Sequence, residues 1–118
     1  MTTAFLAEMP KVELHVHLEG SILPRTVLRL AERNRVALPA TTESELTEWF
    51  TFRDFPHFVE VYVLISQCIK SPEDIELVLR EFLVEQARQN VMYSEVTYTA
   101  STIEKYSGIP WSEQFDAI

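Results

Sequence analysis

A strict alternation of apolar and polar side chains over residues 12–18 restricts the fold more than any other feature of this chain. The apolar positions are Val12, Leu14, Val16 and Leu18. The polar positions between them are Glu13, His15 and His17. A period of two predicts a β-strand with one apolar and one polar face, because successive side chains of a strand point to opposite sides. Gly20 is predicted to end this strand.

Helical periodicity dominates the residues that follow, and the presence of only two glycines suits long helices better than short hairpins. The predicted helices run from about Pro24 to Arg35, from Phe55 to Ile69 and from Pro72 to Gln89. Ser71 is predicted to cap the last of them, with Pro72 in its first position. The remaining predictions are a strand over Val91–Tyr98, connections without regular structure over Pro39–Glu48 and Thr99–Pro110, and a helix that starts after Ser112.

The order of strand, three helices and strand predicts parallel pairing and an α/β architecture. A buried parallel sheet needs more than two strands, because both of its faces must be covered. We therefore expect residues 1–118 to be the N-terminal portion of a single larger domain. The alternative is a small α+β module that an oligomeric partner completes.

The composition is that of a soluble globular protein, with 47% hydrophobic and 24% charged residues among 118. Ten basic and 18 acidic residues give a formal net charge of −8, which argues against binding to nucleic acids or to anionic membranes. Neither a signal peptide nor an apolar window long enough to span a membrane is recognisable. The single cysteine, Cys68, excludes an internal disulfide. We expect a cytoplasmic protein with a small-molecule ligand.

His15 and His17 carry the strongest chemical signal in the sequence. On a strand, positions i and i+2 project from one face, and neutral imidazole is a common ligand for zinc and similar divalent ions. Two histidines supply half of a site, because zinc takes about four ligands. Metal binding and a pair of exposed histidines both agree with this pattern. Glu19, just beyond the strand, is able to accept hydrogen bonds from a sugar hydroxyl or to hold a histidine in place.

Residues 10–22, PKVELHVHLEGSI, closely resemble the first-strand signature of the adenosine deaminase family, the metal-dependent adenosine and adenine deaminases of the amidohydrolase superfamily. The likeness continues in order along the chain. Residues 24–37 resemble the first helix of the family, residues 52–58 its aromatic lid segment, and residues 90–98 its second-strand motif. The resemblance implies a TIM (β/α)8 barrel, of which this chain holds the N-terminal part.

The resemblance also assigns roles to particular residues. It implies that His15 and His17 bind one catalytic zinc ion, and that Glu19 replaces an acidic residue, usually Asp in adenosine deaminases proper, that contacts the ribose. The aromatic residues implied to pack on the base or to close the pocket are Phe52, Phe55 and Phe58. Two departures, Glu19 for Asp and Thr97 for Arg, are similar to adenine deaminases and to the aminodeoxyfutalosine deaminases of menaquinone synthesis.

The implied reaction is hydrolytic deamination of a 6-aminopurine nucleoside of the adenosine type, by a zinc-activated water that attacks C6 of the purine. In the family, the third histidine ligand, the general acid and base and the zinc-binding aspartate lie on later strands, so no catalytic residue is expected within residues 1–118. The remaining histidine, His57, lies in the lid segment and is not expected to bind metal. The alternatives are a deaminase of adenine or aminodeoxyfutalosine, another amidohydrolase, and a non-catalytic truncated product.

Overall fold

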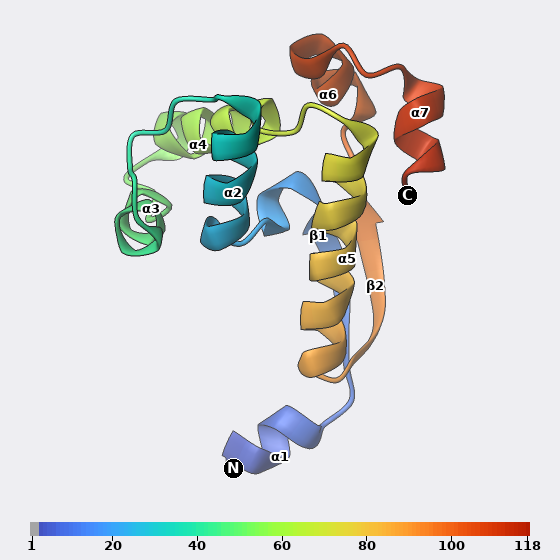
Figure 1. Ribbon diagram of the computed structural model, residues 1–118. Helices are drawn as coiled ribbons and strands as arrows, with labels where there is room; N and C mark the ends of the chain where they lie inside the picture. The colour runs from blue at the N-terminus through green and yellow to red at the C-terminus, as the bar shows by residue number, and fades with distance from the viewer. Residues whose placement is uncertain (1–2) are drawn as a thin grey trace.

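The computed structural model of the chain describes residues 3–118, and its two strands pair in parallel (Figure 1). In chain order the elements are α1 (Thr3–Glu8), β1 (Lys11–His17), the 3₁₀ turn η1 (Glu19–Ser21), α2 (Pro24–Asn34), α3 (Glu43–Trp49), α4 (Phe55–Gln67), α5 (Pro72–Arg88), β2 (Val91–Thr97), α6 (Ala100–Ser107) and α7 (Trp111–Asp116). The α/β prediction is therefore confirmed, with β1 and β2 as neighbours in a two-stranded sheet across the described part of the chain.

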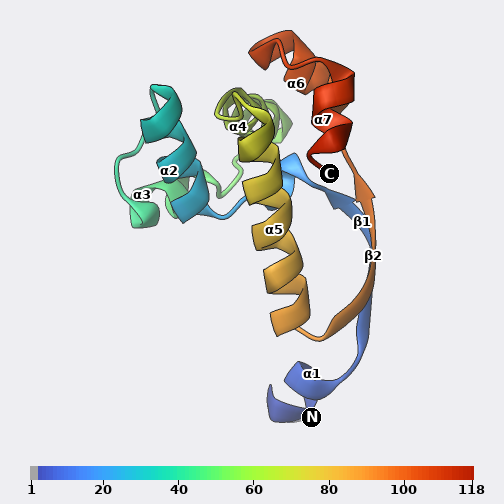
Figure 2. The ribbon, with the colours of Figure 1, turned by 45° about the vertical axis from the view of Figure 1, so that its right-hand side comes forward.

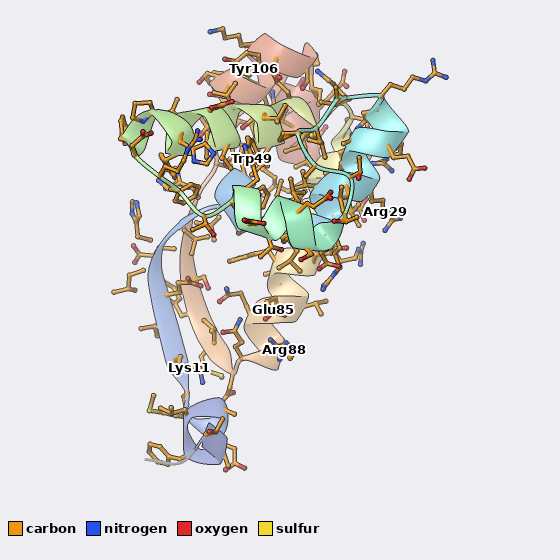
Figure 3. All side chains as sticks on the ribbon, turned by 90° about the vertical axis from the view of Figure 1, so that its left-hand side faces the viewer. Lys11, Arg29, Trp49, Glu85, Arg88 and Tyr106 are labelled. Atoms are coloured by element: carbon orange, nitrogen blue, oxygen red, sulfur yellow. The ribbon has the colours of Figure 1, made fainter. Side chains whose placement is uncertain are left out.

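The helices are distributed unevenly around the strands (Figures 1 and 2). Helix α5 runs alongside both strands on one side, and it contacts β2. Helices α2, α3 and α4 gather near the carboxyl end of β1, and α6 and α7 lie near the carboxyl end of β2. Helix α1 lies at the opposite end, next to Lys11 (Figure 3). No helix within residues 3–118 combines the length and the apolar character needed to cross a membrane.

The predicted start of the long helix α5 is confirmed in detail. Ser71 accepts a hydrogen bond from the backbone N–H of Asp74, and the Asp74 carboxylate accepts one from the backbone N–H of Ser71, with Pro72 in the first turn. Asp74 is fully buried and also accepts a hydrogen bond from the Asn34 side chain of α2, at 2.8 Å. This carboxylate therefore caps one helix and joins it to another, which orients α2 against α5.

Two segments that we expected to lack regular structure contain helices. Helix α3 begins at Glu43 within the predicted connection 39–48, and the preceding residue, Thr42, forms a capping box with Glu45. The segment Thr99–Pro110, predicted as a connection, contains helix α6, which ends at Gly108 in a left-handed conformation with φ of 71°. The residues of α6 have modest helix propensity, but Ile103 is fully buried, and its packing supplies the missing stability.

Two smaller differences concern the ends of the chain. Helix α1 precedes β1, although we predicted no element there, and α7 begins at Trp111 rather than after Ser112.

The apolar core lies between the carboxyl end of β1 and the helices packed around it. Buried residues of β1, of helices α2 to α6 and of the segments between them form one cluster, whose fully buried members include Leu30, Leu46, Ile75 and Ile103. The apolar positions of β1 divide between two environments. Val16 and Leu18 are buried in the cluster, whereas Val12 and Leu14 are 62% and 60% exposed. The core therefore covers the carboxyl end of the strand and leaves its amino end open.

An irregularity in β1 changes the faces that its polar residues occupy. Glu13 pairs with Ser94 and Val16 pairs with Val96, so β1 contains one more residue than β2 between these two pairs. This is the geometry of a β-bulge, which reverses the alternation of side chains. Glu13 accordingly accepts a hydrogen bond from Gln86 of α5, at 2.7 Å. The strictly regular polar face predicted for β1 is therefore interrupted between Glu13 and the two histidines.

Candidate active site

A cleft of about 580 Å³ opens at the carboxyl end of β1. Four parts of the chain form its walls: the second half of β1, the turn η1, one face of α4 and the residue that precedes α6. The lining residues are Glu13, His15, Val16, His17, Gly20, Ser21, Phe58, Tyr62 and Thr99. Functional residues of parallel α/β proteins gather at this end of the strands, because the loops that follow the strands meet there.

His15 and His17 lie together on one wall of this cleft, as the sequence predicted. Their ring centroids are 5.1 Å apart and the rings are nearly perpendicular, at 74°. Two imidazoles that share one tetrahedral zinc ion, with Zn–N distances of about 2 Å, have ring centres roughly 5 Å apart. Both side chains are exposed, so their nitrogen atoms are accessible to an ion. Spacing and donor type therefore suit a shared divalent metal.

The remaining ligands of such a metal are not found in the described part of the chain. Across residues 3–118, no third His, Cys, Asp or Glu side chain joins the pair to form a metal-binding cluster. His57 lies apart from the cleft, buried between the rings of Trp49 and Phe52, and its Nδ1 accepts a hydrogen bond from the backbone N–H of Arg53. The described residues therefore offer two candidate ligands, fewer than the three or more protein ligands that zinc requires.

The opposite wall of the cleft is aromatic and comes from α4. Phe58 and Tyr62 are four residues apart and therefore project from the same face of the helix, with ring centroids 6.3 Å apart. The Tyr62 ring contacts the His17 ring edge to face, also at 6.3 Å. Phe52 and Phe55 pack on Phe58 from the outside and do not line the cleft. Of the three phenylalanines that the sequence singled out, one reaches the cleft directly.

Glu19 lies behind the cleft wall rather than on it. Its side chain is fully buried, and its Oε1 accepts a hydrogen bond from the backbone N–H of Thr99, at 2.7 Å. Its Oε2 has no hydrogen-bond partner among the described residues. The next two residues along the chain, Gly20 and Ser21, do line the cleft. The carboxylate thus connects the end of β1 to the end of β2.

Two half-buried tyrosines, Tyr62 and Tyr98, feel the charge of this carboxylate. Burial is the main reason that the pKa of Tyr62 is raised, and the Glu19 charge raises it further, although the contact with Thr99 lowers it in part. Burial, followed by the Glu19 charge, also raises the pKa of Tyr98. Both phenols therefore remain protonated at neutral pH and are able to donate hydrogen bonds. Tyr98 donates one to Gln114 of α7, at 2.7 Å.

The sequence analysis did not identify Tyr62 and Thr99 as cleft residues. Two signals were present in the sequence. Tyr62 follows Phe58 at helical spacing, and Thr99 comes directly after a predicted strand, where the functional residues of parallel sheets lie. We placed Tyr62 only within the helix predicted from Phe55 to Ile69, and Thr99 at the start of a predicted connection.

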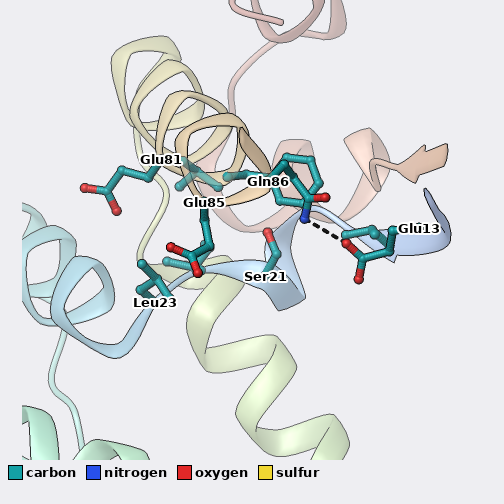
Figure 4. A pocket seen from close by; sticks show the side chains of 10 residues that line it. Glu13, Ser21, Leu23, Glu81, Glu85 and Gln86 are labelled. Atoms are coloured by element: carbon teal, nitrogen blue, oxygen red, sulfur yellow. Dashed lines mark hydrogen bonds between the residues drawn. The ribbon is translucent and has the colours of Figure 1, made fainter. Parts of the chain in front are cut away.

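A second, smaller cavity of about 110 Å³ lies between β1 and α5 (Figure 4). Glu13 and Val16 both line it, which confirms that these two residues, three apart in sequence, face the same helix. Figure 4 shows the hydrogen bond from Gln86 to Glu13 at one side of this cavity. Glu13 and Val16 thus line both this cavity and the larger cleft, whereas His15 and His17 line the larger cleft only.

A parallel α/β arrangement with paired imidazoles and an aromatic wall at the carboxyl ends of its strands defines the general class: a barrel-type or doubly wound protein with a ligand site at the strand ends. The comparisons with known proteins narrow this class. Residues 10–118 match the adenosine deaminase family. The chain belongs to this family.

Individual relatives agree with this assignment. The chain is 45% identical over 96 residues to an aminodeoxyfutalosine deaminase of Streptomyces coelicolor, covering 81% of the chain and 25% of the relative. It is 33% identical over 99 residues to an adenine deaminase of Vibrio parahaemolyticus, covering 84% of the chain and 29% of the relative. The chain thus spans about a quarter of the length of these relatives.

Solved structures confirm the fold. An adenine deaminase from Arthrobacter aurescens superposes with a TM-score of 0.79 at 27% identity, over 92% of the chain and 34% of that structure. An amidohydrolase from Burkholderia ambifaria with bound zinc superposes with a TM-score of 0.82 at 26% identity, over 99% of the chain and 33% of that structure. The chain therefore has the architecture of about one third of a TIM-barrel deaminase.

Proposed function

We propose that residues 1–118 supply two metal ligands and one wall of the substrate cleft of a hydrolytic deaminase that acts on a 6-aminopurine. The observation that carries this proposal is the histidine pair, whose ring spacing of 5.1 Å suits a shared ion and which faces an aromatic wall across the cleft. The zinc bound in the Burkholderia relative and the names of the similar proteins support it.

In this proposal, His15 and His17 hold one divalent metal ion, expected to be zinc, through their ring nitrogens. The other ligands and the general acid and base are expected outside the described residues. The ion, when bound, supplies an activated water for attack on the carbon that bears the amino group. Phe58 and Tyr62 provide flat, largely apolar surfaces that suit packing against a purine ring and exclude water from it.

Among 6-aminopurines, aminodeoxyfutalosine is the first candidate, because the 45% identity to aminodeoxyfutalosine deaminases exceeds the 33% identity to adenine deaminases. Adenine is the second candidate, supported by the Arthrobacter structure. Adenosine, our first expectation from the sequence, ranks behind them, because Glu19 and Thr97 replace residues typical of adenosine deaminases proper.

An ammonia-release assay tests the proposal. The natural-length gene product that contains residues 1–118 is loaded with zinc and supplied in turn with aminodeoxyfutalosine, adenine, adenosine and 2′-deoxyadenosine. We expect ammonia from at least one of these substrates and none when N6 is replaced by a non-hydrolysable substituent. A protein that binds one zinc ion per chain and releases no ammonia from any of the four would contradict the proposal.

A further inference from the structure

We infer that Glu19 is a positioning residue that holds the polar end of the cleft in place through Thr99, rather than a group that contacts the substrate. This inference rests on the proposed function of the cleft, and it differs from the role that the sequence resemblance implies for this position.

The contacts of Glu19 connect three separate parts of the fold. The carboxylate lies in η1, directly after β1, and its Oε1 accepts the hydrogen bond from the backbone N–H of Thr99 at 2.7 Å. The Thr99 hydroxyl lies 3.2 Å from the Tyr62 hydroxyl of α4, within hydrogen-bond distance. Hydrogen bonds in a buried network of this kind restrict the positions of the groups that form them. Glu19 therefore fixes the backbone of Thr99, and Thr99 fixes the position of the Tyr62 ring.

The burial of Glu19 argues against direct contact with a substrate. The side chain has 0% exposure, and the cleft is lined by Gly20 and Ser21 but not by Glu19. The unpartnered Oε2 is also buried, so a ligand in the cleft does not reach it in this conformation. Tyr62 and Thr99 do line the cleft, and Glu19 is linked to both from behind: to Thr99 through its backbone N–H, and to Tyr62 through the Thr99 hydroxyl.

The position of Tyr62 matters for both walls of the cleft. Its ring contacts Phe58 on the aromatic wall and His17 on the metal wall, at 6.3 Å in each case. A shift of Tyr62 therefore changes the shape of the purine site and the support of one proposed metal ligand at once. Because displacements of about 1 Å near a reacting centre reduce rates by up to about a hundredfold, loss of Glu19 should slow the reaction without removing any group that contacts the substrate.

The test compares Glu19→Ala with Glu19→Gln in the natural-length protein. A glutamine keeps one carboxamide oxygen that can accept the Thr99 N–H, whereas alanine removes the acceptor. We expect kcat/KM of Glu19→Ala to fall roughly tenfold or more, by the same factor for adenine, which has no sugar, as for nucleoside substrates. We expect Glu19→Gln to remain within about threefold of the wild type. Glu60→Ala and Glu60→Gln, at an exposed position of α4, are the matched controls.

Two further measurements separate positioning from general loss of structure. Hydrogen exchange at the Thr99 amide should be faster in Glu19→Ala and near wild type in Glu19→Gln, with exchange in α5 unchanged in both. Tyr62→Phe should cost less in the Glu19→Ala background than in the wild type, because the two residues act through one contact.

Three results would overturn the inference: a loss confined to substrates that carry a sugar, equal damage from Gln and Ala, or unchanged exchange at Thr99. A wild-type protein without activity on any aminopurine would contradict the proposed function instead. The exchange comparison would still decide the role of Glu19 in that case.

Discussion

The two ends of the parallel strands differ in how they are held. At the carboxyl end, buried side chains from η1, α4 and α6 meet around the cleft, and Glu19 connects η1 to Thr99. At the amino end, α1 is attached mainly by polar contacts. Lys11 donates hydrogen bonds to the carbonyls of Leu6 and Met9, both at 2.7 Å, and Asn90 donates one to the carbonyl of Glu8.

The two ends of the strands are therefore stabilised by different kinds of contact. The end that carries the paired histidines is packed by buried side chains, whereas at the other end α1 is held by hydrogen bonds, one of them from Asn90, and the apolar residues Val12 and Leu14 are exposed. The paired histidines thus lie at the end of the strands that the core covers. The four predictions below test this contrast, from the largest expected effect to the smallest.

Replacing either histidine of the pair should abolish both metal binding and activity. In the natural-length protein, His15→Ala or His17→Ala leaves too few ligands for a stable zinc site, because structural and catalytic zinc both need three or more protein ligands. Bound zinc, measured by elemental analysis, and ammonia release should fall together to background. The control is His57→Gln, which changes a histidine outside the cleft and should keep the metal. Full metal content and turnover in a His15 variant would refute the assignment.

Truncating a leucine should cost much more stability in the core at the carboxyl end of the strands than near their amino end. Leu46 of α3 has 0% exposure, so Leu46→Ala should lower the free energy of unfolding by about 2–5 kcal/mol. Leu83, near the end of α5, is 55% exposed, and Leu83→Ala should change it by roughly 0.5 kcal/mol. Denaturant unfolding of the natural-length protein measures both, and equal losses would remove the contrast between the two ends.

Adding a methyl group at Gly20 should narrow the cleft without disturbing the fold. A Cβ there would lie 3.7 Å from His17 Cβ and 3.9 Å from Tyr62 Cε2, which are ordinary contact distances. Gly20→Ala should therefore keep bound zinc and raise KM by about three- to tenfold.

The matched control for Gly20→Ala is Gly108→Ala. Gly108 has a left-handed backbone, with φ of 71°, so an alanine at this position should lower the free energy of unfolding by about 1 kcal/mol while KM stays unchanged. A rise in KM for Gly108→Ala, or none for Gly20→Ala, would show that the cleft is not shaped by Gly20.

The single thiol should be nearly inert in the folded protein. Burial raises the pKa of Cys68 to about 11 from a usual value of 9.0, so below pH 9 the thiolate fraction is about a hundredfold lower than in the unfolded chain. Because the unfolded chain loses this proton first, stability should fall as the pH rises from about 9 to 11. Labelling with a thiol reagent at neutral pH should require denaturant, and rapid labelling of the native protein would contradict the burial of this residue.

The sequence predicted the parts of the fold that depend on local patterns. The strand around His15, the capped start of α5 and the parallel α/β order are confirmed, because alternation, capping residues and apolar periodicity act over a few neighbouring residues. Helix α6 was missed because its stability comes from the burial of Ile103 against distant elements. The bulge after Glu13 was missed because register depends on β2.

Part of the candidate site was also predictable from local sequence patterns. The pairing of His15 with His17 followed from their spacing and is borne out by the geometry, since both lie on one wall of the cleft. The burial of Glu19 and the inclusion of Thr99 in the cleft were not predictable, because each depends on how the end of β2 lies against η1.

The long connection between the two strands has a consequence for how the protein is made. β1 ends at His17 and its partner β2 begins at Val91, so five helical segments are synthesised before the strands can pair. At ribosomal rates of about 5–20 residues per second, this interval lasts several seconds. During that time the edges of β1, with Val12 and Leu14, have no strand to pair with, and such edges recruit other chains. We therefore expect the nascent chain to be prone to aggregation until β2 follows.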